Sequence, residues 1–280
     1  MNDTKLRALQ LKELEILKEF KRVCDKCNLQ YYLSDGTLLG AVRHQGFIPW
    51  DDDVDVMMPY KDYLRFLELA KDELDERFFI QNYMTDVHDH QGYTKIRMNN
   101  TAMVMPNHKR WKIHQGVWMD IFPMIPVKNE KDMARRGRLL SYSNFCQMDS
   151  FILDNEEEFS GLLGMAYVPF LIFLKTPIKI RRILHSVLLR YAYRETDEAD
   201  FFTVAWASMK NIYSKSLLEG EATEILFEDS KFNVLPGYEQ YLIDTYGDYM
   251  ELPPVEQRKG HGKLIVDLNR SYTEVVAQFC

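Results

Sequence analysis

Acidic and apolar residues alternate in Asp51–Met58, and this alternation constrains the fold more than any other feature of the sequence. Val54 and Val56 flank the acids as they would in a β-strand that enters a core. Side chains two residues apart on a strand point to the same face, so Asp53 and Asp55 should project together. Two carboxylates at that spacing repel each other unless a cation lies between them, and Mg²⁺ or Mn²⁺ prefers such oxygen ligands. The segment therefore predicts a divalent-metal site rather than a solvated acidic loop, because unpaired buried charge is costly.

Three other classes of acidic or metal-binding motif can be compared with this segment. An EF-hand loop that began at Asp51 would need Gly at its sixth position and Glu at its twelfth, where this chain has Val56 and Asp62. A zinc site is disfavoured because no His or Cys cluster accompanies the acids. A glycosyltransferase Asp-x-Asp motif normally follows a nucleotide-binding βαβ half. Only one long predicted helix and one strand precede Asp53, so this alternative is weaker but stays open.

A glycine-threonine pair lies upstream, between a predicted strand at Leu29–Ser34 and a predicted short helix at Leu38–Arg43. Gly36 would let the backbone approach a phosphate closely. Thr37 would cap the helix, whose free N–H groups favour an anion. Gly36 and Thr37 are therefore predicted to bind phosphate groups of a substrate.

The order of these features resembles a known superfamily. A strand, Gly-Thr, a helix and an Asp-x-Asp strand follow one another as in the nucleotidyltransferases typified by DNA polymerase β, with Thr37 in place of the usual Ser. The segment Gly36–Val56, GTLLGAVRHQGFIPWDDDVDV, is similar to the signature of the LicD family of phosphocholine transferases, whose module fukutin and fukutin-related protein share. Gly116–Pro123 (GVWMDIFP) and Tyr246–Arg258 (YGDYMELPPVEQR) also resemble LicD segments, and His261 follows them.

The resemblance implies a fold and an activity. The fold class is α+β, a nucleotidyltransferase-like mixed sheet flanked by helices, with a helical insertion. We expect a catalytic core at residues 1–150, a basic and apolar insertion at 151–215, where the resemblance is lost, and a C-terminal part at 216–280 that completes the catalytic domain. The implied activity is the transfer of a phospho-alcohol from a nucleotide diphosphate donor with Mg²⁺ or Mn²⁺ as the cofactor. CDP-choline is the expected donor.

The implied acceptor is a sugar hydroxyl of a cell-surface glycan precursor, of the teichoic acid or lipopolysaccharide type, and we expect it to be lipid-linked. Two alternatives keep the fold but change the transferred group, to ribitol or glycerol phosphate or to a nucleotide monophosphate. A third alternative is a non-catalytic glycan- or lipid-binding module with a vestigial site. The intact set of acids weakens it, because a lost catalyst has no reason to keep costly adjacent charges.

A third acid, Asp120, lies in the middle of a predicted apolar strand, Val117–Phe122. A carboxylate in such a strand needs a partner. In the resembled fold a third acid on a neighbouring strand completes the metal site, so the resemblance adds Asp120 to the first two acids as a catalytic residue and a metal ligand. It would bind the metal or remove the proton of the acceptor hydroxyl. The alternative is a buried acid paired with Arg43 or Arg97.

Two cations share one face of a predicted strand at Tyr93–Met98. Lys95 and Arg97 would contact the donor's phosphates, or would protect an exposed sheet edge. We expect this strand to form a hairpin with Thr101–Met105 around a turn at Asn99-Asn100.

Three further cations are assigned to the donor's phosphates. Arg43 lies in the LicD-like signature, at the end of the predicted short helix. Arg258 and His261 follow a proline-rich turn. They would close over the phosphates, or would form a solvated end of the chain.

Composition limits the partners and the compartment. The 280 residues carry a net charge of −7, which disfavours nucleic acid as a partner. The N-terminus lacks the basic and apolar pattern of a signal peptide, and the four cysteines do not form the framework of a secreted disulfide protein. We therefore expect the reducing cytoplasm.

A basic and apolar stretch at residues 162–194 suggests a position at the inner face of the cell membrane. Residues 160–194 contain no Asp or Glu and six Lys or Arg. Leu162–Leu174 is apolar, but it is too short to span a bilayer and is interrupted by Pro169. Ile178–Arg194 has the pattern of a basic amphipathic helix, which suits a peripheral membrane contact. The alternative is a helical insertion that packs on its own domain.

Overall fold

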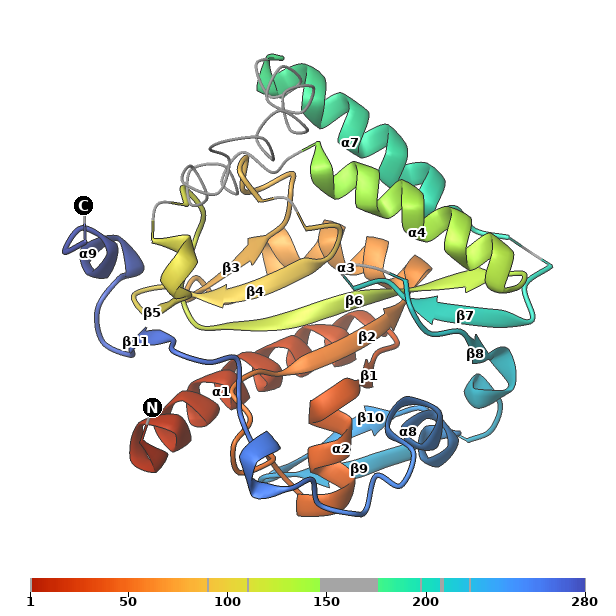
Figure 1. Ribbon diagram of the computed structural model, residues 1–280, viewed down its shortest axis with the longest axis horizontal. Coiled ribbons are helices and arrows are strands. Elements are labelled where there is room, and N and C mark those ends of the chain that lie inside the picture. The colour runs from red at the N-terminus through yellow and green to blue at the C-terminus, as the bar shows by residue number, and fades with distance from the viewer. Residues whose placement is uncertain are drawn as a thin grey trace.

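The structure, a computed structural model, describes residues 2–89, 91–109, 111–146, 176–196, 198–206, 209–221 and 223–279. Within these ranges a mixed sheet of seven strands lies at the centre, and helices flank it (Figure 1). This architecture confirms the predicted α+β class with a mixed sheet.

The strands form one large sheet and two small ones in the described part of the chain. The large sheet contains β1 (Tyr32–Leu33), β2 (Asp55–Pro59), β3 (Phe78–Gln81), β4 (Thr94–Met98), β6 (Trp118–Val127), β7 (Phe201–Val204) and β8 (Tyr213–Ser214). Its order is β1-β2-β6-β4-β3, while β7 pairs with β6 and with β8. The small sheets pair β9 (Thr223–Phe227) with β10 (Ser230–Val234), and β5 (Ala102–Val104) with β11 (Ile265–Asp267).

Helices surround the large sheet on several sides. The α-helices are α1 (Asp3–Cys27), α2 (Asp35–His44), α3 (Tyr60–Glu73), α4 (Glu130–Phe145), α7 (Ile178–Ala192), α8 (Tyr238–Tyr246) and α9 (Tyr272–Val276). Short 3₁₀ helices are η1 (Pro106–His108), η2 (Lys215–Leu218) and η3 (Val255–Gln257). In Figure 1, α1 and α3 lie against the sheet, α4 and α7 pack side by side, and α2 and α8 lie beside β9 and β10. None of these helices has the length and apolar content that a membrane span requires.

α1 shows how the local sequence dictates an element. Apolar residues such as Leu17 and Phe20 recur at helical spacing and predict a helix at Thr4–Cys27, which α1 confirms. The Asn2 side chain accepts a hydrogen bond from the Lys5 backbone N–H at the start of the helix. Asn28, in the left-handed region, ends it.

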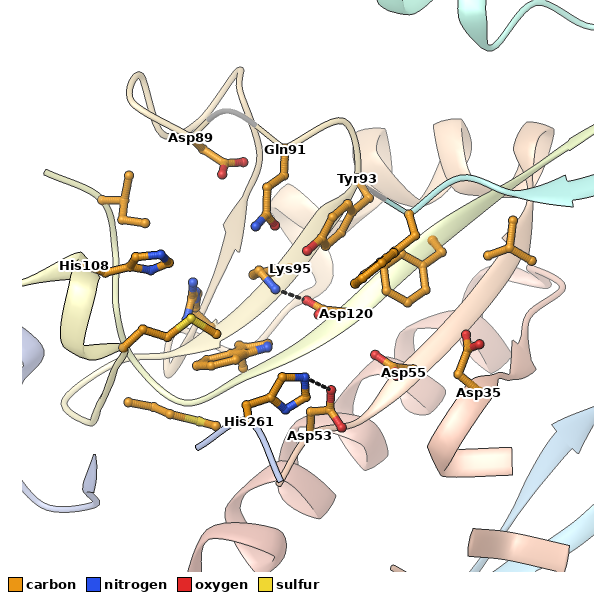
Figure 2. A pocket seen from close by; sticks show the side chains of 18 of the residues that line it. Asp35, Asp53, Asp55, Asp89, Gln91, Tyr93, Lys95, His108, Asp120 and His261 are labelled. Carbon is orange, nitrogen blue, oxygen red and sulfur yellow. Dashed lines mark hydrogen bonds and ion pairs between the residues drawn. The ribbon is translucent and has the colours of Figure 1, made fainter. Parts of the chain in front are cut away.

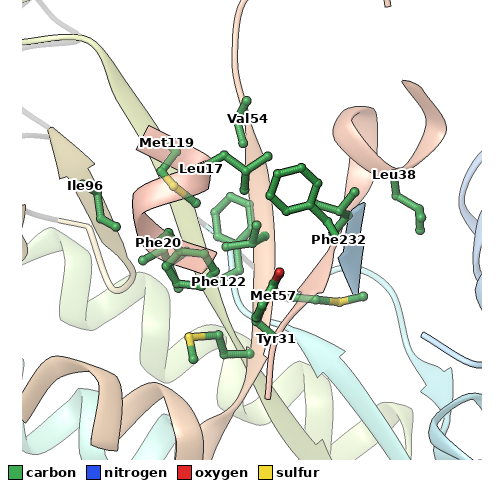
Figure 3. Packing of buried hydrophobic residues seen from close by; sticks show 14 of the residues in the cluster. Leu17, Phe20, Tyr31, Leu38, Val54, Met57, Ile96, Met119, Phe122 and Phe232 are labelled. Carbon is green, nitrogen blue, oxygen red and sulfur yellow. The ribbon is translucent and has the colours of Figure 1, made fainter. Parts of the chain in front are cut away.

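The alternation of side chains on the strands separates the core from the opposite face. Ile96 on β4 and Met119 on β6 are fully buried and pack with Phe20 of α1 (Figure 3). The residues next to them along the strands, Lys95 and Asp120, point to the other face. A register slip of one residue would exchange the two sets, so the apolar pattern fixes which charged groups share a face.

The predicted hairpin around Asn99-Asn100 is wrong. The chain does turn there, with a φ of 57° at Asn100. β4 then pairs with β3 and β6, whereas β5 pairs with β11 near the C-terminus. β4 therefore has a neighbouring strand on each side and lies in the interior of the sheet. The alternative in which Lys95 and Arg97 protect a sheet edge is therefore also wrong.

The predicted basic and apolar insertion lies partly outside the described residues, which resume at residue 176. α7 packs on α4, and their buried residues form a satellite core with Ile125 and Val127 of β6. β7 falls inside the predicted insertion and is nevertheless a strand of the large sheet. The division of the chain into three regions stays a prediction.

Candidate active site

A pocket of about 460 Å³ opens on the strand face that carries Lys95 and Asp120 (Figure 2). The predicted site residues that line it are Asp53, Asp55, Lys95, Arg97, Asp120 and His261. The other predicted site residues lie away from its lining: Gly36, Thr37, Arg43 and Arg258.

Asp55 and Asp120 come together because β2 and β6 are neighbouring parallel strands. The two residues are partners in the register, and the Asp120 backbone N–H donates to the Val54 carbonyl oxygen at 2.8 Å. Asp53 precedes β2 by two residues and lines the same pocket. Acids from two adjoining strands thus face one cavity. Their roles in metal binding and proton transfer stay predictions.

Thr37 supports Asp55 and does not cap a helix. α2 begins at Asp35, with Ser34 at the N-cap position and no side-chain cap, so the predicted cap at Thr37 is wrong. The Thr37 hydroxyl instead accepts a hydrogen bond from the buried backbone N–H of Asp55 at 2.8 Å. This bond satisfies a donor at the first residue of β2 and ties that strand to α2.

Gly36 leaves space for the acidic loop. A Cβ at this position would lie 2.7 Å from Oδ2 of Asp51, which is too close for a real side chain. Burial, followed by the charge of Asp53, raises the pKa of Asp51 to about 8. The close contact that requires glycine at position 36 is therefore with the side-chain carboxyl group of Asp51. The predicted phosphate contact of Gly36 stays a prediction.

Burial, together with neighbouring acids, raises the pKa of Asp53 and of Asp55. Burial, and then the charges of Asp53 and Asp120, raise the pKa of Asp55 well above its usual range. Burial also raises the pKa of Asp53, although His261 opposes the shift. A divalent cation would relieve this repulsion, and the carboxylate donors fit Mg²⁺ or Mn²⁺. The fit is one of donor chemistry, because no three acidic, His or Cys side chains in the described ranges are already arranged around a common metal position.

Lys95 neutralises part of this negative charge. Its ammonium forms a buried ion pair with Asp120 (Figure 2) and lies 5.0 Å from the ring centroids of both Tyr93 and Trp118. Burial lowers the pKa of Lys95, although Asp120 opposes the shift. The partner of Asp120 is thus a lysine, and the alternative that paired it with an arginine is wrong.

Arg97 is held at the pocket wall by the protein. Its Nε donates to Oε1 of Gln81 at 2.7 Å, and its Nη1 donates to the Gly116 carbonyl oxygen at 2.9 Å. Its guanidinium carbon lies 4.7 Å from the ring centroid of Trp118. Burial lowers the pKa of Arg97 to about 10. Because a guanidinium has five N–H donors, these bonds leave donors for a ligand.

His261 reaches the acidic loop from the far end of the chain. Its backbone N–H and its ring Nδ1 donate to Oδ1 of Asp52 at 2.9 Å and 2.8 Å, and its Nε2 lies 3.5 Å from Oδ2 of Asp53 (Figure 2). The bond with Asp52, aided by the neighbouring charges, outweighs burial and raises the pKa of His261 to about 9. Gly260 permits this approach, because a Cβ there would lie 2.5 Å from Asp52.

Arg43 and Arg258 stabilise turns near the pocket. Nη1 of Arg43 donates to the Tyr249 carbonyl oxygen at 2.8 Å. Nε of Arg258 donates to the Pro253 carbonyl oxygen at 2.9 Å, and its guanidinium carbon lies 5.2 Å from the ring centroid of Trp50. Both arginines therefore bind backbone of the proline-rich turn. Their predicted phosphate contacts stay predictions.

Comparison with known proteins identifies the module that carries these acids. A family model described as "LicD/FKTN/FKRP, nucleotidyltransferase domain" matches residues 28–154. This stretch of the chain is therefore similar to the LicD family. The lipopolysaccharide cholinephosphotransferase LicD of Haemophilus influenzae is 28% identical over 268 residues, which are 93% of this chain and 97% of that protein. The ribitol 5-phosphate transferase FKRP of Homo sapiens is 37% identical over 79 residues, 27% of this chain and 15% of FKRP. An uncharacterized protein of Rickettsia typhi, RT0683, is 43% identical over 63 residues, 22% of this chain and 20% of that protein.

The matched residues 28–154 supply most of the pocket, and later residues complete it. The later contributors include Trp206, Tyr213, Tyr241 and His261. Sequence reasoning missed the aromatic and apolar lining, because its members come from many segments: Tyr93, Trp111, Ile113, Trp118, Phe122, Trp206, Tyr213 and Tyr241.

Asp35 is another acid of the pocket that sequence reasoning missed. It opens α2 with a left-handed φ of 46° and lines the cavity near Asp55 (Figure 2). Burial raises its pKa to about 6. Its place directly before Gly36 in the LicD signature is the signal that could have found it.

Glu13 is a further acid that electrostatics connects with the site. It is fully buried on α1, and neither carboxylate oxygen has a hydrogen-bond partner among the residues that the structure describes. Burial, and then the charge of Asp53, raise the pKa of Glu13 well above its usual range. Its position next to Leu14, on the apolar side of the helix, is the sequence signal for this burial.

Proposed function

We propose that this protein is a Mg²⁺-dependent transferase that moves phosphocholine from CDP-choline to a sugar hydroxyl of a cell-surface glycan precursor. The observation that carries the proposal is the pairing of Asp55 with Asp120 across two parallel strands, with Asp53 beside them in one pocket. Similarity to Haemophilus influenzae LicD along 93% of the chain supports choline as the transferred alcohol. The proposed acceptor is a lipid-linked precursor of the lipopolysaccharide or teichoic acid type, at the inner face of the cell membrane.

Asp53, Asp55 and Asp120 are the residues that would hold Mg²⁺ or Mn²⁺, whose charge would offset that of the donor's diphosphate. When the donor binds, the Lys95 ammonium would release Asp120 and donate a hydrogen bond to a phosphate oxygen instead. Asp120 would then accept the proton of the acceptor hydroxyl as that oxygen attacks phosphorus.

His261 and Arg97 would supply positive charge on the donor's side. With a pKa of about 9, His261 is protonated at pH 7, so its Nε2–H can donate to a phosphate oxygen of the departing CMP. Arg97 is already oriented by Gln81 and would lose little freedom when it contacts the donor.

A second candidate is the transfer of a polyol phosphate. The specific observation in its favour is the local similarity to FKRP, which is named as a ribitol 5-phosphate transferase. This candidate keeps the same acids and the same leaving group, CMP. Transfer of a nucleotide monophosphate would instead release pyrophosphate, and a non-catalytic binding module would release neither product.

Product analysis combined with thermal denaturation tests these candidates. The purified chain is incubated with Mg²⁺ and with CDP-choline, CDP-ribitol, CDP-glycerol or a nucleoside triphosphate. A ligand that binds the native state raises the melting temperature, and we expect the largest rise, with CMP release in the presence of acceptor, for CDP-choline. Preference for CDP-ribitol would favour the second candidate. Glycan binding that is indifferent to metal, without nucleotide affinity, would refute the enzyme.

A further inference from the structure

An apolar stripe runs along the exposed side of α7, which lies at the outer edge of the molecule (Figure 1). At 100° per residue its members lie within one face of the helix: Ile180, Ile183, Leu184, Val187 and Tyr191. Each is between 40% and 65% exposed. The opposite face is buried through Arg181, His185, Leu189 and Ala192. Five exposed apolar side chains in one row mark an interaction surface, since such residues normally occur singly.

Cations flank this stripe. Lys179 and Arg190 are exposed and lie, at 100° per residue, on the same flank of α7, which contains no Asp or Glu. Neither cation forms an ion pair with another residue that the structure describes. Among the described acids, Glu195 pairs with Lys61, and Asp132 pairs with arginines of α4. On α7 itself, the charge beside the stripe is therefore positive.

The buried side of α7 contacts a loop that forms part of the pocket rim. The Tyr193 hydroxyl, just after the helix, donates to the Gly92 carbonyl oxygen at 2.9 Å. Arg182 Nη2 donates to the Tyr83 carbonyl oxygen at 3.1 Å, and the His185 ring lies 4.5 Å from the Tyr83 ring between centroids. The same loop contributes to the pocket through Asp89, Gln91 and Tyr93. A partner that binds the outer side of α7 would therefore contact a helix that also contacts the pocket rim.

We propose that the outer face of α7 docks on an anionic lipid surface. The apolar stripe would insert among the lipids, and Lys179 and Arg190 would lie at the level of the headgroups. The combination favours lipid over an apolar protein partner, because an apolar stripe flanked by cations on the same helix is complementary to an apolar surface with negative headgroups. α7 has 15 residues, so it would lie along the surface and could not cross it. The proposal stands on the α7 surface and is independent of the transferred group.

Vesicle flotation of the purified full chain tests the proposal. We expect binding to vesicles of phosphatidylcholine mixed with phosphatidylglycerol, weaker binding to phosphatidylcholine alone, and loss of the difference in high salt. The double variant Lys179→Gln, Arg190→Gln should bind the anionic vesicles roughly thirtyfold more weakly, the change equivalent to about 1 kcal/mol per cation. The double variant Ile183→Glu, Val187→Glu should bind at least about tenfold more weakly.

Matched controls separate this surface from the rest of the molecule. Val255→Glu changes an apolar residue of η3 that is 69% exposed, and the pair Lys5→Gln, Lys112→Gln removes two exposed cations elsewhere. Both controls should bind like the wild type. Melting temperatures report whether each variant folds, and the cation variant keeps the test decisive if the glutamate variant unfolds.

Three outcomes would overturn the proposal. The first is equal binding of the wild type to neutral and anionic vesicles, or no binding to either. The second is undiminished binding by the folded α7 variants. The third is a wild-type dimer in sedimentation velocity that Ile183→Glu converts into a monomer, because a second copy of the chain would then cover the stripe.

Discussion

Glu13 shows how a single residue outside the pocket can respond to the charges within it. Both of its carboxylate oxygens are buried without a hydrogen-bond partner among the residues described. Burial first, and then Asp53, raise its pKa well above the usual range. The folded protein therefore keeps this proton at pH values where the unfolded chain has released it. An acid with a raised pKa makes the folded state progressively less stable as pH rises above the value of the unfolded chain.

Glu13→Gln should consequently stabilise the protein at pH 8 and have its smallest effect near pH 4. Denaturant unfolding at the two pH values measures the free energy of unfolding of both proteins. Glu15→Gln, which changes a half-exposed acid of the same helix, is the matched control and should stay within about 0.5 kcal/mol of the wild type. A Glu13→Gln effect that does not change with pH would show that the wild-type carboxyl is not held protonated.

At the scale of elements, the bond from Thr37 joins α2 to the strand that presents Asp55. Thr37→Val keeps the shape of the side chain but leaves the Asp55 backbone N–H buried without an acceptor, which should cost about 1–3 kcal/mol of stability. We also expect lower turnover, because β2 positions the carboxylate. Thr37→Ser retains the hydroxyl and should be close to the wild type in both measurements. Equal losses in the Val and Ser variants would contradict this role.

Elements were predictable where the signal is local. The strand that begins at Asp55 and the strand with Asp120 could be predicted, because alternation over a few residues sets which side chains share a face. The start of α2 was misplaced, since Asp35 adopts a left-handed φ that the sequence does not demand. The partner of β5 could not be found, because its register joins it to β11, more than 150 residues away.

In the candidate site, too, only the features with a local sequence signal could be predicted. Which acids face one cavity follows from strand periodicity and the resemblance. The contact between Asp52 and His261 spans 209 residues and has no local pattern. Lys95 as the partner of Asp120 likewise depends on β4 lying beside β6, a pairing that the predicted hairpin did not include.

At the scale of the whole molecule, the pair of Asp52 and His261 ties the C-terminal part to the LicD-like residues 28–154. The pKa of His261 is raised to about 9, so its contribution to stability is complete below about pH 6.5 and is lost as pH rises through 9. Asp52→Asn should therefore lower the melting temperature at pH 6.5 more than at pH 10. It should also speed hydrogen exchange of the His261 amide, which donates to Asp52. A melting-temperature difference that is constant with pH would contradict the ion pair.

CMP release from CDP-choline, with Mg²⁺ and a glycan acceptor, tests most directly the claim that Asp53, Asp55 and Asp120 serve phosphotransfer in one pocket. We predict that Asp53→Asn and Asp55→Asn each lower the rate roughly a thousandfold, equivalent to about 4 kcal/mol of transition-state stabilisation, while both proteins remain folded. Asp229→Asn, which changes an exposed acid paired with Lys18, should release CMP at the wild-type rate. Near-normal release by either pocket variant would contradict the account.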